Sequence, residues 1–152
     1  MRIRVALAST LSGVLLLLAG CAEYPRDIEG TSDTIAARGT IRVGLVAGPG
    51  MPDPATAPFL AELSRRLQAK PVTTTGSAEP LLLDLDAGRL DLVIGEMSKK
   101  TPWLTHAAVI EPLKTRKLGE DEITLSAIAK NGENRWVITL EKTIRDLKDK
   151  PA

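Results

Sequence analysis

The segment from Leu82 to Gly95, LLDLDAGRLDLVIG, is the most informative part of the sequence for the fold. Its first half continues a helix that opens after Ser77, a residue type suited to cap a helix start. Gly88 is placed to end that helix. The second half, Leu92 to Gly95, is a short apolar run typical of a strand covered on both faces. The segment therefore predicts a helix followed at once by a buried strand.

The same alternation extends in both directions along the chain. Hydrophobic spacing predicts helices over 57–69 and 77–88, and a last helix that starts near 131–134 and buries Trp136, Leu140 and Ile144. β-branched and apolar runs predict strands near 41–46, 72–75, 91–95 and 123–129, with a short strand over 107–110. Such alternation predicts an α/β domain over 35–150, with a mostly parallel sheet flanked by helices.

Three segments in this order resemble a known family. They are GTIRVG at 39–44, the segment at 82–95 and Thr101-Pro102-Trp103. Together they resemble the first lobe of the extracellular solute-binding proteins of family 3, which serve amino-acid ABC transporters. The resemblance implies the fold of one domain of a type II periplasmic binding protein. Only the twelve residues 111–122 stand where a second lobe would be inserted, and domains rarely fall below about 50 residues. The chain is therefore expected to be a single lobe closed by a short connector.

The ligand chemistry of the family is expected to be altered. Family members commonly follow Thr-Pro with Glu-Arg, and that arginine holds the carboxylate of the ligand through a bidentate pair. This sequence has Trp103 and Leu104 at the two positions, and Arg116 is the residue that could swing in. Conventional capture of an amino acid is not expected.

Candidate ligand-binding residues follow the third long strand, because ligands of open α/β sheets bind beyond the carboxyl ends of the strands. Ser98, Lys99 and Thr101 would supply polar groups, and Trp103 a flat surface for stacking. The alternative is that these are ordinary surface loop residues, with Trp103 packed on the edge of the domain. We favour this alternative, because half of the usual cleft is missing.

The N-terminus reads as a secretory signal. A positive start, MRIR, precedes an apolar stretch over 5–18, and Leu18-Ala19-Gly20-Cys21 follows. This last stretch looks like the lipobox of bacterial lipoprotein precursors. The resemblance implies cleavage before Cys21, a diacylglyceryl thioether on its sulfur and acylation of the new amino group. We therefore expect a signal peptide over 1–20 and a polar, flexible, lipidated tether over 21–34. In resembling lipoproteins an Asp after the cysteine commonly retains the protein in the inner membrane. Ala22 stands there, which favours the periplasmic face of the outer membrane.

Composition excludes several kinds of function. Cys21 is the only cysteine and His106 the only histidine, which leaves few arrangements for a thiolate or imidazole metal site. Without the two arginines of the signal, 18 basic side chains (20 − 2) face 19 acidic ones, so nucleic acid is not expected as a partner. The sequence lacks a G-x-S-x-G or G-x-G-x-x-G pattern. We expect no enzyme activity, no metal and no cofactor.

Two functions stay open at this point. The first is a solute-binding-like lipoprotein, an accessory or sensor beside a transport system, that binds a small amino-acid-like solute weakly or with a partner. The second is a ligand-free lipoprotein whose lobe has become a protein-interaction module. The expected partners are the membrane, through lipid on Cys21, and an ABC permease or another envelope protein.

Overall fold

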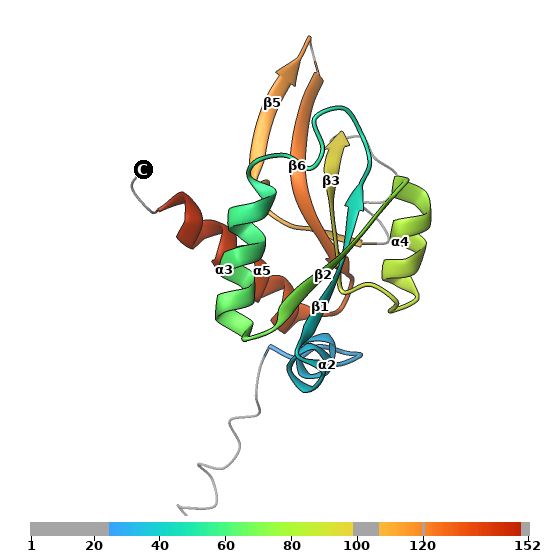
Figure 1. Cartoon of the computed structure of the whole chain (residues 1–152), viewed down its shortest axis with the longest axis vertical. Helices are drawn as coiled ribbons and strands as arrows, with labels where there is room; N and C mark the ends of the chain where they lie inside the picture. The colour runs from blue at the N-terminus through green and yellow to red at the C-terminus, as the bar shows by residue number, and fades with distance from the viewer. Residues whose placement is uncertain (1–24, 99–106, 120, 150–152) are drawn as a thin grey trace, which may run out of the picture.

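The computed structural model describes residues 25–98, 107–119 and 121–149 (Figure 1). Helices and strands alternate through most of this length. The helices are α2 (Thr31–Arg38), α3 (Thr56–Leu67), α4 (Ala78–Asp86) and α5 (Asn134–Lys148). The strands are β1 (Thr40–Val46), β2 (Lys70–Gly76), β3 (Leu92–Ser98), β4 (Ala107–Val109), β5 (Lys114–Leu118) and β6 (Asp121–Lys130).

All six strands belong to one mixed sheet. Its order is β2-β1-β3-β6-β4, and β5 also pairs with β6. The strands β2, β1 and β3 are parallel, whereas β6 runs antiparallel to β3, β4 and β5. The predicted single α/β lobe, with a sheet flanked by helices, is confirmed.

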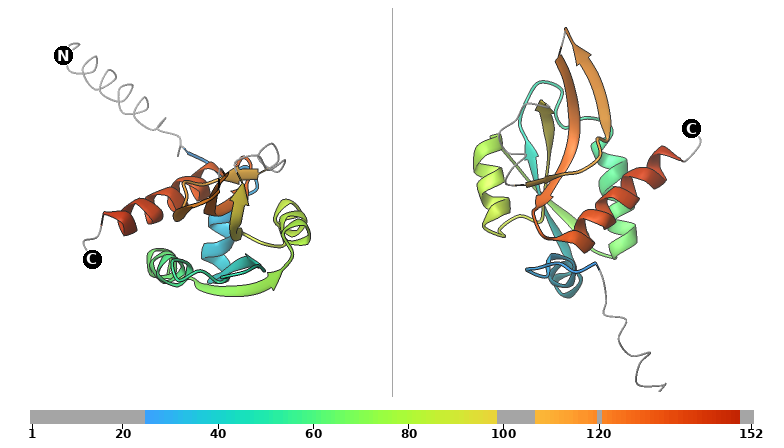
Figure 2. Two further views of the ribbon diagram at one scale, coloured as in Figure 1. Left: turned by 90° about the horizontal axis from the view of Figure 1, so that it is seen from above. Right: turned by 180° about the vertical axis from the view of Figure 1, so that it is seen from behind.

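Helices cover both faces of the sheet. Ile94 belongs to a core shared with Phe59 of α3 and Trp136 of α5, and its neighbour Val93 belongs to a core shared with Leu82 of α4. Successive residues of a strand point to opposite faces, so α3 and α5 lie on one face and α4 on the other (Figure 2, left). The predicted burial of Trp136, Leu140 and Ile144 is confirmed, since each is at most 1% exposed.

Gly95 allows β1 and β3 to pack closely. A Cβ atom at this position would lie 2.6 Å from a methyl group of Val46. Any larger residue would therefore push β1 and β3 apart, just where both strands approach their carboxyl ends.

The connector over 111–122 is more regular than expected. It contains β5 and the start of β6, which form a hairpin in which Leu118 pairs with Asp121. The sequence KTRKL of β5 lacks the apolar alternation of a half-buried strand. Backbone pairing along β6 stabilises it as a strand, and its side chains at 114–117 are exposed.

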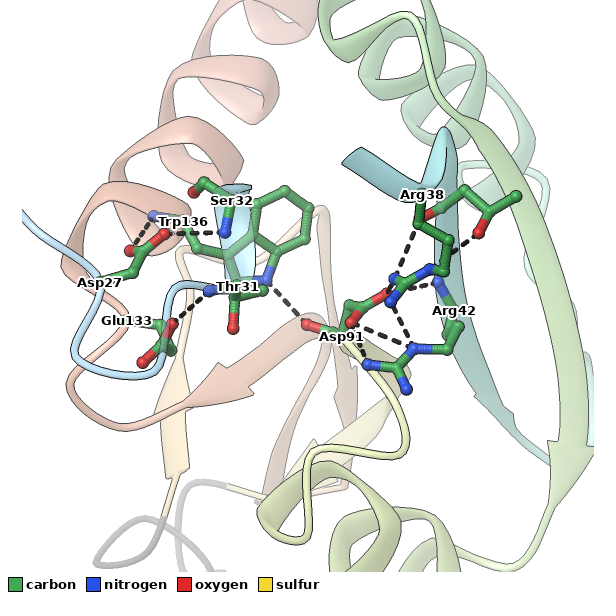
Figure 3. A network of polar contacts seen from close by, with 9 residues as sticks. Asp27, Thr31, Ser32, Arg38, Arg42, Asp91, Glu133 and Trp136 are labelled. Atoms are coloured by element: carbon green, nitrogen blue, oxygen red, sulfur yellow. Dashed lines mark hydrogen bonds and ion pairs between the residues drawn. The ribbon is translucent and has the colours of Figure 1, made fainter. Parts of the chain in front are cut away.

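The prediction of a flexible tether over 21–34 is wrong for residues 25–34. Helix α2 begins at Thr31, and the segment before it is held against the start of α5 (Figure 3). The carboxylate of Asp27 accepts hydrogen bonds from the backbone N–H groups of Ser32 and Trp136, both at 2.9 Å. The carboxylate of Glu133 accepts those of Glu29 at 2.7 Å and Thr31 at 2.8 Å. We name residues 27–32 the clamped segment.

Asp91, just before β3, is a buried acid. It is 4% exposed, and its carboxylate pairs with the guanidinium groups of Arg38 and Arg42. Its carbonyl oxygen accepts a 2.7 Å hydrogen bond from Nε1 of Trp136. Asp91 therefore ties the start of β3 to β1, α2 and α5.

Candidate functional site

The carboxyl ends of the three parallel strands meet at one edge of the sheet, which we name the strand-end edge. β1 ends at Val46, β2 at Gly76 and β3 at Ser98. Ligands of open α/β sheets bind outside such an edge. In Figure 1 this edge lies at the upper end of the molecule, beside the β5–β6 hairpin.

The sheet register brings an acid and a base together at this edge. Glu96 of β3 lies opposite Leu125 of β6, and Arg116 of β5 lies opposite Ile123 on the other side of the same strand. Directly paired residues share a face, so Glu96 and Arg116 meet across β6. Nε and Nη2 of Arg116 donate to the two carboxylate oxygens of Glu96, both at 2.8 Å. The result is a bidentate ion pair, the strongest geometry for such a contact.

A second ion pair lies on the same face. Asp53, in the loop before α3, accepts a 2.9 Å hydrogen bond from the ammonium group of Lys114. Its other carboxylate oxygen accepts the backbone N–H of Ala55, also at 2.9 Å. Two alternate positions of β5, Lys114 and Arg116, thus supply the basic partners of both acids.

The four groups balance one another electrically. The Arg116 guanidinium holds the pKa of the Glu96 carboxyl below its ordinary value. The N–H of Ala55 and then the ammonium group of Lys114 hold the pKa of Asp53 below its ordinary value. The Glu96 and Arg116 side chains remain 27% and 41% exposed. The cluster therefore pairs two acidic with two basic side chains, has no net formal charge and is partly exposed to solvent.

Of the predicted ligand-binding residues, only Ser98 lies within the part of the chain that the structure describes. Ser98 is the last residue of β3, opposite Ile123, which places its backbone at the strand-end edge. Lys99, Thr101 and Trp103 lie outside the described residues, and so does Cys21. Their predicted roles stay predictions.

Sequence reasoning did not single out Glu96, Asp53 or Lys114 as site residues, and it named Arg116 without a partner. The position of Glu96 directly after the apolar run 92–95 was an available signal. The alternation of Lys114 and Arg116 in the connector was another, because residues two apart in a strand share a face. Neither signal reveals the ion pairs without the register along β6.

A hollow at the opposite end of the sheet is too small for a conventional ligand. It has a volume of about 100 Å³, and Arg42, Asp91 and Lys130 are among its lining residues. Small-molecule sites commonly measure roughly 300 to 1,000 Å³. Within the described part of the chain, acidic, histidine and cysteine side chains form no group of three that could hold a metal ion. Over the same residues, no helix combines the length and the apolar character needed to cross a membrane.

Comparison with known proteins identifies the fold through structure. No protein-family model and no curated protein matches the sequence. A point mutant of the arginine-bound form of domain 1 of TmArgBP, from T. maritima, superposes with a TM-score of 0.68 at 19% identity, covering 78% of this chain and 99% of that one. An amino-acid ABC transporter substrate-binding protein from Streptococcus pneumoniae, bound to L-arginine, gives 0.66 at 9% identity, covering 78% and 92%. An ancestral amino-acid-binding protein, a precursor of cyclohexadienyl dehydratase, gives 0.66 at 13% identity, covering 78% and 93%.

The class follows from these likenesses. The chain has the fold of one domain of the amino-acid ABC transporter substrate-binding proteins. The resemblance stated from the sequence is confirmed at the level of the fold.

Proposed function

We propose that this chain is a lipid-anchored, single-lobe solute-binding-like lipoprotein that acts as an accessory or sensor beside a transport system. The observation that carries the proposal is the charged cluster of Asp53, Glu96, Lys114 and Arg116 at the strand-end edge of a binding-protein lobe. A neighbour of the same fold is an isolated domain 1 in an arginine-bound form. That neighbour supports the idea that one lobe suffices for a ligand.

The cluster favours a small zwitterion, such as an amino acid, bound weakly. A molecule with one carboxylate and one cationic group can replace the contact between Glu96 and Arg116 by two contacts of its own. The site then still has no net charge. Arg116 would take the carboxylate, and Glu96 the cationic group. Exposed ion pairs contribute only about 0–1 kcal/mol. Breaking the pair of Glu96 and Arg116 therefore costs little free energy, and the new contacts with the ligand give only weak binding.

Titration of the intact lipoprotein in detergent micelles with L-arginine, L-alanine and acetate tests this binding. Thermal unfolding and calorimetry are the readouts. At tenfold excess over its Kd, a ligand raises the free energy of unfolding by about 1.4 kcal/mol. We expect a stabilising shift with at least one zwitterion and none with acetate at equal ionic strength.

Two variants locate the site. Arg116→Gln removes the bidentate partner of Glu96 and should abolish the shift. Arg89→Gln is the matched control, because it breaks an exposed ion pair with Asp84 at the end of α4 and should leave the shift intact. Equal loss in both variants would contradict a site at the strand-end edge.

The second candidate function is a ligand-free protein-interaction lipoprotein. It is favoured by the fact that Arg116 and Lys114 already have acidic partners within the chain. Absence of any shift with the zwitterions, together with co-purification of an envelope protein that depends on Arg116, would support this function over the first.

The proposal includes no catalysis. Binding proteins predominate among the structural neighbours described above, and the ancestral precursor of a dehydratase is the one connected with an enzyme. A solute recovered unchanged after incubation with the lipoprotein is the expected result, and its conversion would overturn this part.

Lipid attachment to Cys21 and placement on the periplasmic face of the outer membrane, favoured by Ala22, also belong to the proposal. Labelling cells with radioactive palmitate tests the attachment. We expect label on the natural chain and none on Cys21→Ser. Separation of inner and outer membranes on a density gradient tests the placement, which recovery in the inner-membrane fraction would contradict.

A further inference from the structure

The clamped segment fixes the path by which the chain enters the lobe. The Glu133 residue is fully buried, and so is the side chain of Asp27. Between them these carboxylates accept four backbone N–H groups, three of them from the segment over 29–32 and one from α5. An ion pair of 2.6 Å between Lys130 and Glu29 adds a contact to the end of β6. Release of the segment would leave the buried carboxylate of Glu133 without its two donors and the N–H of Trp136 without its acceptor, which is costly.

The clamp leaves a short connection to the proposed lipid. Asp27 follows Cys21 by six residues (27 − 21). A fully extended chain spans at most about 3.6 Å per residue, so Asp27 lies within roughly 20 Å of the lipidated cysteine whatever the path. A free tether over 21–34 would have had a longer reach, so the clamp restricts how far the lobe can turn over.

The clamped segment and the strand-end edge lie at opposite ends of the molecule. β6 has ten residues and runs from the hairpin, at Asp121, to Lys130 beside the clamped segment. At about 3.3 Å per residue the two ends are separated by roughly 30 Å. Figure 1 shows the same arrangement, with α2 at the lower end and the β5–β6 hairpin at the upper end.

An apolar side chain is exposed at the clamped end. Ile28 is 80% exposed, although the segment that carries it is held by hydrogen bonds to the buried carboxylate of Glu133. Its side chain lies over Gly132, where a Cβ atom would be 2.7 Å away. An exposed isoleucine close to a bilayer gains free energy by entering the headgroup region.

We infer that the lobe stands on the bilayer with α2 and Ile28 at the lipid headgroups and with the strand-end edge turned away from the membrane. The inference rests on the proposed lipid at Cys21. It means that the surface of Asp53, Glu96, Lys114 and Arg116 meets solutes and partners from the aqueous side. A permease in the same bilayer would not face this edge.

Energy transfer to labelled lipid tests the orientation. Once Cys21 carries its lipid thioether, an introduced cysteine is the only free thiol of the mature chain. Ala37→Cys on α2 and Lys117→Cys on β5 provide two exposed sites for the same dye. The dye-labelled lipoproteins are reconstituted in phosphatidylcholine vesicles that contain an acceptor on the lipid headgroup. We expect strong transfer from position 37 and weak transfer from position 117.

A variant with a longer tether sharpens the test and leaves the sequence of the lobe unchanged. Ten Gly/Ser residues inserted between Ala22 and Glu23 add a flexible chain with a mean span of roughly 17 Å. The lobe is then free to turn over, so transfer from position 117 should rise toward that from position 37. Unchanged circular dichroism and melting temperature confirm that the lobe itself is intact.

The outcomes separate this inference from the proposed function. A lipoprotein that floats with the vesicles but shows equal transfer from both positions overturns the orientation and leaves the lipid anchor standing. A chain that does not float, and takes up no palmitate, overturns the anchor and the orientation together. The orientation is supported if transfer from position 117 is weak in the original lipoprotein and increases in the variant with the longer tether.

Discussion

The two ends of the sheet use the same chemical groups in opposite ways. At the amino end, the carboxylates of Asp27, Asp91 and Glu133 are buried and accept hydrogen bonds from backbone or arginine donors. At the carboxyl end, Glu96 and Asp53 hold basic side chains that are about half exposed. Acid–base pairing alone therefore does not distinguish a structural group from an exchangeable one. Burial does, because a buried group cannot be rehydrated when its partner leaves.

The largest expected effect on stability is at Trp136, a fully buried side chain at the amino end of the sheet. Trp136→Ala should lower the free energy of unfolding by about 3–5 kcal/mol, since it empties a fully buried site. Trp136→Phe keeps most of the volume and loses the hydrogen bond to Asp91, so its loss should be smaller. Urea unfolding measures both, and equal losses would contradict the separation of packing from hydrogen bonding.

Glu133→Ala should lower the free energy of unfolding by a smaller amount, about 2 kcal/mol, because the N–H groups of Glu29 and Thr31 lose their acceptor. Hydrogen exchange should show faster exchange in α2 and unchanged exchange in β3. The matched change at the other end is Glu96→Ala, which should leave α2 protected. Faster exchange of α2 in the Glu96 variant would break the distinction between the two ends.

Acid should weaken the amino end in a defined direction. Burial acts to raise the pKa of Asp27, but the hydrogen bonds from Ser32 and Trp136 and the charge of Arg135 outweigh it and hold the pKa below 3.8. The stability that Asp27 contributes is therefore present above the ordinary value and is lost as the pH falls through the lower, folded value. Asp27→Asn should flatten the pH dependence of stability below pH 3.8. Parallel curves for the two chains in that range would contradict this account.

The smallest expected effect is at the strand-end edge. Arg116→Gln should leave the melting temperature unchanged near neutral pH, because the pair is exposed. It should raise the pKa of Glu96 toward 4.5, since the guanidinium that lowers it is gone. Titration of the Glu96 carboxyl by NMR measures this, and Arg89→Gln is the control in which the Glu96 pKa should not move.

The sequence predicted local structure well and long-range contacts poorly. The run of Leu92 to Gly95 and the spacing of Trp136, Leu140 and Ile144 carry their own periodicity, so their burial could be inferred. β5 carries none, because β6 stabilises it through the backbone while its side chains face water. Recognition of the clamped segment depends on Asp27 and Glu133, which are 106 residues apart (133 − 27) and give no local signal.

The candidate site shows the same limit. The strand-end edge was predictable, since it follows from parallel strands. Pairing of Glu96 with Arg116 was not, because it requires the register of β3 and β5 on the two sides of β6. The burial of Asp91 was not predictable either, because its partners Arg38 and Arg42 come from earlier in the chain.

The hairpin of β5 and β6 has a consequence for how this fold is extended. Leu118 and Asp121 lie opposite each other, so the chain leaves and re-enters the sheet at neighbouring points. An exposed tip of this kind is where another domain is inserted with least disturbance. The hairpin tip is thus a point at which this lobe can accept an inserted domain. A guest domain placed there would project from the end opposite the clamped segment and leave the strand order intact.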